Sequence, residues 1–379
     1  DLQGMRGDLT KNYALGASID ASATENWNAG AGFAPIGNSS DESFGGILNG
    51  LGNQVIGLHI NRPALILAGL VGVLDRSGVV QNLGVVNANV RGSSIDESLT
   101  DTRGIGILVG DNRGRIADSF VSGVVHGRIA VGGLVGQNRV SGRIPRAYAI
   151  ADLPHKMNWG GGFVGYNRGT ITDSYAVADI PNGNYRVGGF VGENIASGDI
   201  SNSYAVSRVS PYLYGFSGPL GGFVGYNQGS LTNTFNRGAN GNDPYAQSTY
   251  GTKTEGVWTG FDFDNTWFMI DGQTRPMLRM EQSTTITNAN QLQLMVLGPD
   301  QDYRLGNDID LTAVLSRDQG LWRAGFVPVG DTANGSVFTG SFDGGFNMVS
   351  GLSVNIDRDV NDGLFGDVDN ATVTNLRLH

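Results

Sequence analysis

A glycine-rich motif of seven residues that ends in asparagine occurs five times in the middle of this chain of 379 residues. The copies begin at residues 106, 132, 161, 188 and 221 and read GILVGDN, GGLVGQN, GGFVGYN, GGFVGEN and GGFVGYN. The last glycine of the motif recurs after 26, 29, 27 and 33 residues. Periods in this range are typical of proteins in which one small unit stacks on the next. The fold is therefore repetitive.

Each copy is followed by residues that repeat in columns, with a step of two between one column and the next. The apolar column is Ile116, Ile144, Ile171, Ile200 and Leu231, and the aromatic column four residues later is Phe120, Tyr148, Tyr175, Tyr204 and Phe235. A period of two predicts strands, and no stretch has apolar residues at helical spacing long enough to compete. We predict two short strands in each repeat and a third side of variable sequence.

A unit of about 27 residues with glycine corners and no helix cannot bury its own apolar face. It must stack on copies of itself, with equivalent residues one strand spacing apart. The sequence therefore predicts an all-β fold, a parallel β-helix or β-solenoid, with the isoleucine column inside. Side-chain amides of asparagine commonly bond at turns, so we expect the motif asparagines to bond one another and the turn backbone at a corner. These structural asparagines are Asn112, Asn138, Asn167, Asn194 and Asn227.

Composition supports a folded shaft and excludes several classes of function. The chain has 60 glycines and 16% charged residues, but 40% of its residues are hydrophobic, which is too many for a disordered linker. Cysteine is absent, which excludes disulfides, thiol catalysis and cysteine metal sites. The sequence contains no run of 18 apolar residues, so no membrane span is predicted. The net charge of -10 and the scattered basic residues argue against a nucleic-acid partner.

A second repeat operates over a longer distance. YALGASID at 13–20 recurs as YRLGNDID at 303–310, and GFAPIGN at 32–38 recurs as GFVPVGD at 325–331. We therefore predict a first array over 1–282 and the truncated start of a homologous second array over 283–379. Within the first array the core repeats occupy about 105–235, and an aromatic segment at about 257–280 closes it. A short helical turn is expected at ANQLQLM, 289–295.

These residues resemble a known family. Repeats of the form GGFVGYNxGxIxxSYA are similar to the GLUG motif. The order of YxLGxxID, PIG, the repeats and the closing DNTWFMIDGQTRPMLR resembles a module of filamentous-haemagglutinin-type adhesins of Gram-negative bacteria. The resemblance covers essentially the whole chain. It implies a secreted, right-handed β-helical fibre that leaves the cell through a partner pore in the outer membrane, by two-partner secretion, and is displayed at the bacterial cell surface.

The best candidates for catalysis are the carboxylates of one column, Asp118 and Asp173, with Arg146 between them. If the column stacks, the two carboxylates lie about 10 Å apart, two strand spacings, which is near the separation used by inverting glycosidases. An interposed guanidinium is expected to pair with both, which opposes the raised pKa that a general acid needs. We therefore interpret Asp118, Arg146 and Asp173 as a salt-bridge ladder. No catalytic residue, metal site or cofactor is predicted.

The candidate binding residues lie on the variable third side of each coil, where loops protrude on one side. Loops on a rigid scaffold commonly carry recognition, and aromatic rings with a few polar neighbours suit sugar rings or protein contacts. Alternatively, these rings lie flat over the coil below and protect strand edges. The candidates are Trp159, Tyr185, Arg186, Tyr212, Tyr214 and Phe216.

A β-helix hosts both adhesins and polysaccharide-cleaving enzymes, so the function must be argued from sites. The sequence favours a non-enzymatic segment of a large secreted bacterial adhesin, a rigid fibre that attaches to host cells, other bacteria or surfaces. Its partner would be a glycan or a host or bacterial surface receptor. The alternatives are a carbohydrate-active β-helix, either a polysaccharide lyase or a glycoside hydrolase, and the stalk of a contact-dependent toxin delivery protein.

Overall fold

The computed structural model divides the chain into two compact units, Asp1–Tyr250 and Gly251–His379. It describes residues 2–93, 103–211, 218–236, 246–248, 254–315, 325–330, 336–354 and 363–379. The aromatic segment 257–280 belongs to the second compact unit. We predicted from the repeats in the sequence that the first array ends at residue 282, and this boundary stays a prediction.

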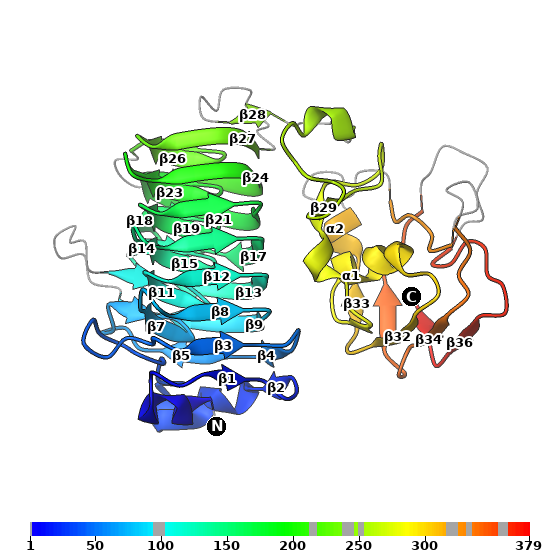
Figure 1. The fold of residues 1–379 in the computed structure, drawn as a ribbon, viewed down its shortest axis with the longest axis horizontal. Coiled ribbons are helices and arrows are strands. Elements are labelled where there is room, and N and C mark those ends of the chain that lie inside the picture. The colour runs from blue at the N-terminus through cyan, green and yellow to red at the C-terminus, as the bar shows by residue number, and fades with distance from the viewer. Residues whose placement is uncertain are drawn as a thin grey trace. The chain divides into compact units, whose positions relative to one another are not determined.

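The first unit is built almost entirely of short strands that follow one another around successive coils (Figure 1). Its two 3₁₀ helices are η1 (Gln3–Gly7) and η2 (Ser22–Gly30). The strands that precede the motif copies are β1 (Tyr13–Ala14), β2 (Ile19–Asp20), β3 (Ile47–Asn49), β4 (Gln54–Ile56), β5 (His59–Asn61), β6 (Leu67–Ala68), β7 (Val71–Leu74), β8 (Val79–Gln81) and β9 (Gly84–Arg91).

The motif repeats form the remaining strands of this unit. They are β10 (Gly104–Ile105), β11 (Val109–Asn112), β12 (Arg115–Ala117), β13 (Ser119–His126), β14 (Ile129–Gly132), β15 (Val135–Asn138), β16 (Arg143–Pro145), β17 (Ala147–Asp152), β18 (Met157–Gly161), β19 (Val164–Asn167), β20 (Thr170–Thr172), β21 (Tyr175–Tyr185), β22 (Val187–Gly188), β23 (Val191–Asn194), β24 (Asp199–Pro211), β25 (Leu220–Gly221), β26 (Val224–Asn227), β27 (Ser230–Asn236) and β28 (Gln247–Ser248). One coil, for example β18 to β21, thus holds four strands and not the two that we predicted.

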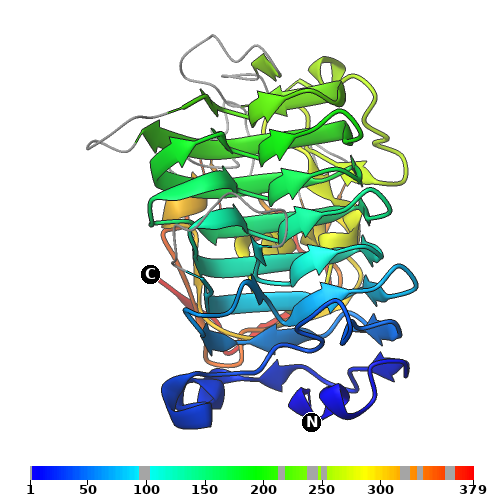
Figure 2. The same ribbon diagram turned by 90° about the vertical axis from the view of Figure 1, so that its left-hand side faces the viewer.

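The coils stack in register along the motif. Strands β7, β11, β15, β19, β23 and β26 form one parallel sheet of six strands, one from each coil. Val109 pairs with Val135, Val135 with Val164, and Val164 with Val191, so the same motif position lies above itself. Figure 2 shows these strands lying one above another. The predicted all-β parallel solenoid is confirmed.

The interior of the first unit consists of columns of identical or similar side chains. The isoleucine column is inside as predicted: its four isoleucines have no exposed surface. The motif phenylalanines form a second column, with ring centroids 4.7 Å apart between Phe163 and Phe190 and 4.8 Å between Phe190 and Phe223. These rings are nearly parallel and fully buried. Burial of such columns is the main stabilising term, about 25 cal/mol for each Å² of apolar surface removed from water.

The five motif asparagines form a continuous ladder of hydrogen bonds between side chains. Each amide nitrogen donates to the amide oxygen of the next coil, at 2.8 Å from Asn112 to Asn138 and 2.7 Å from Asn167 to Asn194. The ladder continues to Asn227. The turn backbone also takes part, because the backbone N–H of Gly169 donates to Asn167. The asparagines therefore bond one another and the turn that follows each motif.

The expected step of two from strand to strand is interrupted at one corner of each coil. Asp118, Arg146 and Asp173 have φ angles of 48°, 52° and 49°, in the left-handed region, as do their column neighbours Asn82, Asn202 and Asn233. Asparagine and aspartate tolerate this conformation better than most residues, which explains their frequency in the column. The left-handed residue reverses the side-chain alternation, so our assumption of uninterrupted alternation was wrong.

Buried serines complete this corner from the inside. The hydroxyl of Ser174 donates to the carbonyl of Thr172, two residues back across the corner, at 2.8 Å. Ser119 makes the equivalent bond to Ala117 at 2.7 Å. Each of these carbonyls also accepts a backbone N–H of the preceding coil, from Arg146 at 3.1 Å for Thr172 and from Asn82 at 3.2 Å for Ala117. The serine hydroxyl therefore supplies a second bond to a buried carbonyl oxygen, which has two lone pairs to satisfy.

The second unit contains short helices and three small sheets. Its helices are η3 (Glu255–Val257), η4 (Arg279–Glu281), α1 (Ala289–Gln293), η5 (Leu294–Leu297) and α2 (Thr312–Leu315). Its strands are β29 (Trp267–Phe268), β30 (Met277–Leu278), β31 (Thr285–Ile286), β32 (Asp302–Leu305), β33 (Ile309–Asp310), β34 (Ser341–Asp343), β35 (Met348–Ser350), β36 (Thr372–Thr374) and β37 (Arg377–Leu378). The helical turn expected at 289–295 is present, and Asn288 caps it by accepting a bond from the Gln291 N–H.

The opening strands of the two units pair in the same register. In the first unit Tyr13 lies opposite Leu48, and in the second the equivalent Tyr303 lies opposite Phe342. The isolated bridges also correspond, as Ile36 with Val71 and Val329 with Phe365. The long-distance repeat in the sequence is therefore a repeat in structure.

We expect Asn167→Ala to lower the free energy of unfolding by about 3 kcal/mol. The change strands a buried donor on Asn138 and a buried acceptor on Asn194, and each such group costs about 1–3 kcal/mol. Asn227→Ala is the matched control, because Asn227 ends the described ladder and is half-buried. Urea unfolding measures both, and equal losses at the two positions would contradict a ladder held by its buried members.

Candidate functional site

A second corner of the coils also adopts the left-handed conformation, but with residues that disfavour it. Ala130, Trp159 and Arg186 have φ angles of 52°, 54° and 52°. Their neighbours pair in register, since Ile129 lies opposite Asn158 and Asn158 opposite Tyr185. The three residues therefore occupy one position in three successive coils. A left-handed residue with a large side chain costs about 1–2 kcal/mol, and such strain is concentrated at functional sites.

Trp159 and Arg186 each lie beside the residue seven positions later, which stands between the last glycine and the asparagine of the motif. The indole of Trp159 contacts the ring of Tyr166, with centroids 5.1 Å apart. Arg186 forms an ion pair with Glu193, with Nη1 and Oε1 2.5 Å apart. Tyr166 and Glu193 are themselves direct neighbours in the parallel sheet. Two adjacent coils thus place an aromatic pair beside an ion pair.

The guanidinium of Arg186 is held between aromatic rings. Its central carbon lies 4.9 Å from the ring centroid of Tyr185 and 4.2 Å from that of Tyr226, which suits cation–π attraction. Burial opposes the charged form most strongly, but the hydrogen bond and the charge of Glu193, together with Tyr185 and Tyr226, outweigh it and raise the pKa of Arg186. The guanidinium therefore stays charged and fixed in place.

We call Trp159, Tyr166, Tyr185, Arg186, Glu193 and Tyr226 the corner cluster. Trp159 is 8% exposed and Glu193 is 3% exposed, while Tyr185, Arg186 and Tyr226 are half-exposed. Three buried polar atoms of the cluster have no hydrogen-bond partner in the described part of the chain. They are Trp159 Nε1, Arg186 Nε and Glu193 Oε2.

The structure brings together the predicted binding residues Trp159, Tyr185 and Arg186. The other three candidates, Tyr212, Tyr214 and Phe216, lie outside the described residues. Sequence reasoning did not assign Tyr166, Glu193 and Tyr226 to a binding site. It took this position of the motif as structural, and it considered Glu193 only as a catalytic partner of Asp111, which is three coils away. The sequence did contain a signal for this position. The residue directly before the motif asparagine is Asp, Gln, Tyr, Glu and Tyr in the five copies, so its chemical class changes from coil to coil.

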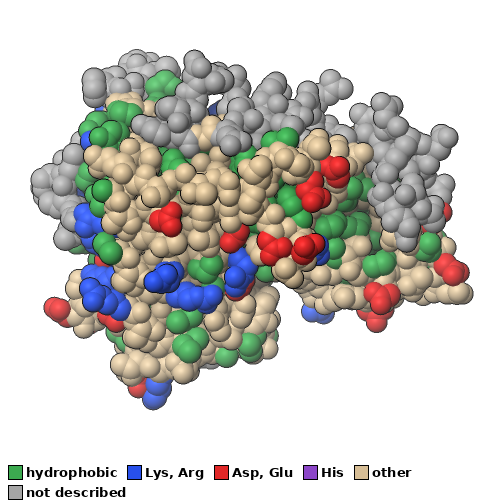
Figure 3. All heavy atoms as spheres, turned by 45° about the horizontal axis from the view of Figure 1, so that its top comes forward, with side chains coloured by type: hydrophobic (Ala, Val, Ile, Leu, Met, Phe, Trp, Pro, Cys, Tyr) green, Lys and Arg blue, Asp and Glu red, His purple; other side chains and the backbone are tan. Residues whose placement is uncertain are grey.

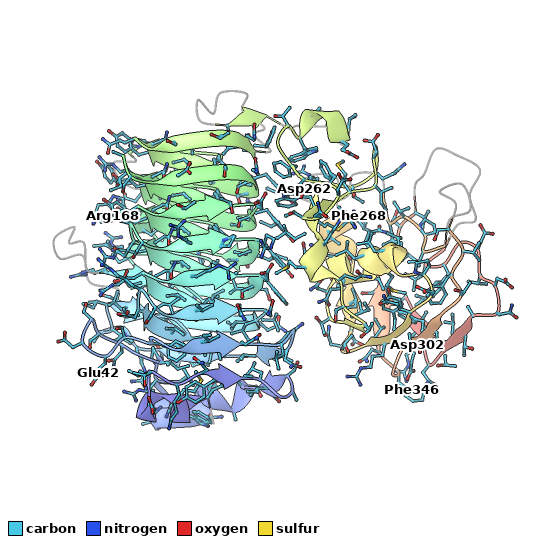
Figure 4. The ribbon with its side chains drawn as sticks, viewed as in Figure 1. Glu42, Arg168, Asp262, Phe268, Asp302 and Phe346 are labelled. Atoms are coloured by element: carbon cyan, nitrogen blue, oxygen red, sulfur yellow. The ribbon has the colours of Figure 1, made fainter. Side chains whose placement is uncertain are left out.

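A row of arginines lies beside the asparagine ladder. Arg113, Arg139 and Arg168 each follow a motif asparagine, and Figure 4 shows Arg168 at the edge of the solenoid. Arg113 and Arg139 both pair with the buried carboxylate of Asp111, at 3.1 Å and 2.7 Å. Figure 3 shows Lys and Arg side chains gathered on the left-hand side of the view, over the first unit. Asp111 thus neutralises part of the positive charge of this row of arginines.

The candidate catalytic column forms an ion pair and not a pair of free carboxylates. The guanidinium of Arg146 donates to both carboxylate oxygens of Asp118, from Nε to Oδ1 at 2.6 Å and from Nη2 to Oδ2 at 2.7 Å. This bidentate bond, followed by the charges of Asp118 and Asp173, raises the pKa of Arg146 despite partial burial. The arrangement holds charges in place and leaves no proton donor between them.

A second acidic column lies on β17, β21 and β24, where Asp152 pairs in register with Asp179, and Asp179 with Arg208. Arg208 binds Asp179 through two hydrogen bonds of 2.8 and 2.6 Å. Burial, followed by the charge of Asp179, raises the pKa of Asp152. The carboxylate of Asp179 is thus paired, whereas that of Asp152 has no ion-pair partner among the described residues.

Two histidines that are far apart in the sequence lie side by side. The ring centroids of His126 and His155 are 4.6 Å apart. Burial, followed by the charges of His155 and Arg91, lowers the pKa of His126 to about 4.

Across the described ranges, no group of three or more His, Asp or Glu side chains is placed to hold a metal ion.

The second unit has a cavity of about 320 Å³. It lies beside the β29–β30 hairpin, and its lining is largely apolar, with Phe268, Met269, Ile270 and Val327. Arg279 supports this hairpin by donating to the carbonyl of Trp267 at 3.0 Å. Trp267 is fully buried, so the aromatic closing segment forms a small core.

None of the helices that the structure describes is both long and apolar enough to cross a membrane.

Comparison with known proteins bears out the repeat. The family model of the GLUG motif matches residues 183–210, which include three members of the corner cluster. The chain therefore carries the GLUG motif. Halomucin from Haloquadratum walsbyi (strain DSM 16790 / HBSQ001) is 41% identical over 132 residues, which are 34% of this chain and 1% of that protein. The chain thus spans only about a hundredth of the length of this relative.

One solved structure is similar over much of the chain. It is described as a "putative immunoglobulin A1 protease" from Bacteroides ovatus, at 18% identity and a TM-score of 0.42, and the match covers 74% of this chain and 90% of that one. Likeness at this level carries no argument about function.

We expect Asp152→Asn to stabilise the chain at pH 7 by about 0.5 kcal/mol, because like charges directly opposite on adjacent strands repel. The raised pKa means that the folded state holds the proton more tightly than the unfolded state, so the stability of the natural chain rises as pH falls through that pKa. The advantage of the variant should therefore disappear in acid. Thermal unfolding from pH 7 to pH 3.5 tests this, with Asp199→Asn as the control for net charge. An advantage that persists in acid would contradict it.

Proposed function

We propose that this chain is a non-enzymatic segment of a large extracellular surface protein, in which the solenoid is a stiff shaft for adhesion. The observation that carries the proposal is the uninterrupted register of six coils along β7, β11, β15, β19, β23 and β26. Every coil adds hydrogen bonds to both neighbours and one more member to each side-chain column. Bending such a shaft would strain many bonds at once, and each added coil contributes its own interface to the stability of the shaft.

The length of a relative supports the same proposal. A relative that is 41% identical over 132 residues has about a hundred times that length. Within this chain, the opening strands of a solenoid occur twice with the same pairing. Repeated arrays in a very long protein suit reach away from a cell better than they suit a single active site.

The proposal includes adhesion as the role of the shaft and a location outside the cell. The resemblance to filamentous-haemagglutinin-type adhesins supports export through a partner pore where the producing cell has an outer membrane. Partners of the shaft would be glycans or receptors on opposing surfaces.

An enzymatic role is less well supported than a binding role. The carboxylate of Asp118 is held by Arg146, and that of Asp179 by Arg208. A glycosidase needs one carboxylic acid that donates its proton and a second carboxylate that acts as nucleophile or base. Ion pairs in both acidic columns stabilise charge on the surface of the shaft, which suits a fibre.

Labelling of intact producing cells tests the proposed location and role. Antibodies raised against the purified chain should label unpermeabilised cells, and their Fab fragments should reduce attachment of the cells to surfaces. Antibodies against a cytoplasmic protein are the control for leaky cells. Labelling that requires permeabilisation would rule out display at the surface.

A separate assay tests the non-enzymatic part of the proposal. The purified chain is incubated with a panel of neutral and acidic polysaccharides, and the release of reducing ends and unsaturated uronates is measured. We expect no release above that of heat-denatured chain. Release that Asp118→Asn or Asp179→Asn abolishes would replace the adhesin with the carbohydrate-active alternative.

A further inference from the structure

The corner cluster has features that packing alone does not require. Trp159 adopts the left-handed conformation although it carries the largest side chain of any residue type, and glycine would adopt it without strain. Its neighbour in the column, Ala130, shows that the corner needs no indole. Buried polar atoms without partners are also unfavourable, and this small cluster contains three.

The three atoms have complementary chemistry. Trp159 Nε1 and Arg186 Nε carry hydrogens and can only donate, whereas Glu193 Oε2 can only accept. A hydroxyl group is both a donor and an acceptor, so a pair of neighbouring hydroxyls could satisfy all three atoms. Arg186 and Glu193 neutralise each other beside the three atoms, and the guanidinium of Arg168 lies on the Tyr166 side of the cluster, 5.0 Å from the centroid of that ring. The charge next to the three atoms is therefore balanced, which suits a neutral ligand there.

The rings around these atoms fit the same kind of ligand. Trp159 and Tyr166 form one aromatic pair, and Tyr185 and Tyr226 lie on either side of Arg186. A sugar ring has an apolar face of C–H groups and an edge of hydroxyls. Aromatic rings that contact the face, with polar groups that bond the edge, match the usual composition of small-molecule sites.

We propose that the corner cluster is a binding site for a neutral glycan, with Trp159 stacking on the sugar ring and Glu193 accepting from one of its hydroxyls. The inference rests on the proposed function, since an extracellular location brings the site into contact with glycans. Tyr185, Arg186 and Tyr226 are half-exposed and are the route from solvent to the buried atoms. Rotation of Tyr185 or Tyr226 opens this route, and the hydrogen bonds gained with the ligand offset the cost.

The test uses the purified chain of 379 residues on a printed array of neutral, sialylated and sulfated oligosaccharides. We expect binding to neutral glycans, and the best of them is then titrated by calorimetry. Glu193→Gln should weaken this binding by about tenfold, because it removes a charged acceptor. Trp159→Gly should abolish it, while the strain at this corner is relieved.

Two matched variants separate binding from folding. Ala130→Gly changes the same corner one coil away and should bind like the natural chain. Trp159→Phe keeps one aromatic ring and removes the indole N–H together with the second ring, so it should bind about fivefold more weakly. Thermal unfolding of each variant shows that it is folded. The Trp159 Nε1–H resonance, assigned by its loss in Trp159→Phe, should move when the glycan is added.

Several outcomes would overturn the proposal. They are a folded chain that binds no neutral glycan, a preference for sialylated or sulfated glycans, and binding that Trp159→Gly leaves unchanged. Surface labelling of intact cells with a negative array would reject this site and leave the proposed function standing. Glycan binding by a chain that stays inside the cell would reject the proposed function and leave the site.

Discussion

The spacing between neighbouring strands is the constraint on which this structure depends. Parallel strands lie about 4.8 Å apart, and the ring centroids of Tyr148, Tyr175 and Tyr204 follow that spacing at 4.9 and 5.0 Å. Each residue is therefore stacked on its own equivalent. Flat rings and amides can stack on copies of themselves, because a ring presents a face to each neighbour and an amide both donates and accepts. Like charges repel when they stack in this way, and the ion pairs of Asp118 with Arg146 and of Asp179 with Arg208 avoid that cost. Asp152, which lies opposite Asp179, does not avoid it.

The sequence was sufficient for every part of the fold that depends on this stacking. Columns of isoleucine and asparagine predict an interior and a ladder, because identical residues at one period can only be neighbours. It was not sufficient for the corners. The left-handed conformation of Arg146 and Trp159 is imposed by the coils above and below, and neither residue type signals it. One such corner reverses the alternation of side chains, so a period of two could not be followed through it.

The candidate site shows the same division. Trp159, Tyr185 and Arg186 were recognisable as unusual residues in a variable segment, and the structure places them together. Glu193 was not recognisable, because its partner Arg186 belongs to the preceding corner and the two meet only when the coil closes. The closing segment is a similar case. Glu281 accepts from Leu278 and from Asn290, bonds that tie the segment to the helix that follows it.

The motif separates the residues that hold the shaft from those that it can vary. The last glycine of the motif cannot be replaced where a side chain would meet the neighbouring coil, as at Gly165, where an added Cβ would lie 2.8 Å from the carbonyl oxygen of Gly136. Asparagine cannot be replaced without breaking the ladder. The position between this glycine and the asparagine varies, and in two coils it pairs with the corner seven residues earlier, as Tyr166 does with Trp159 and Glu193 with Arg186. A solenoid can therefore change its surface chemistry coil by coil at these two positions while its register stays the same, and the corner cluster, where an aromatic coil meets a charged one, is one result.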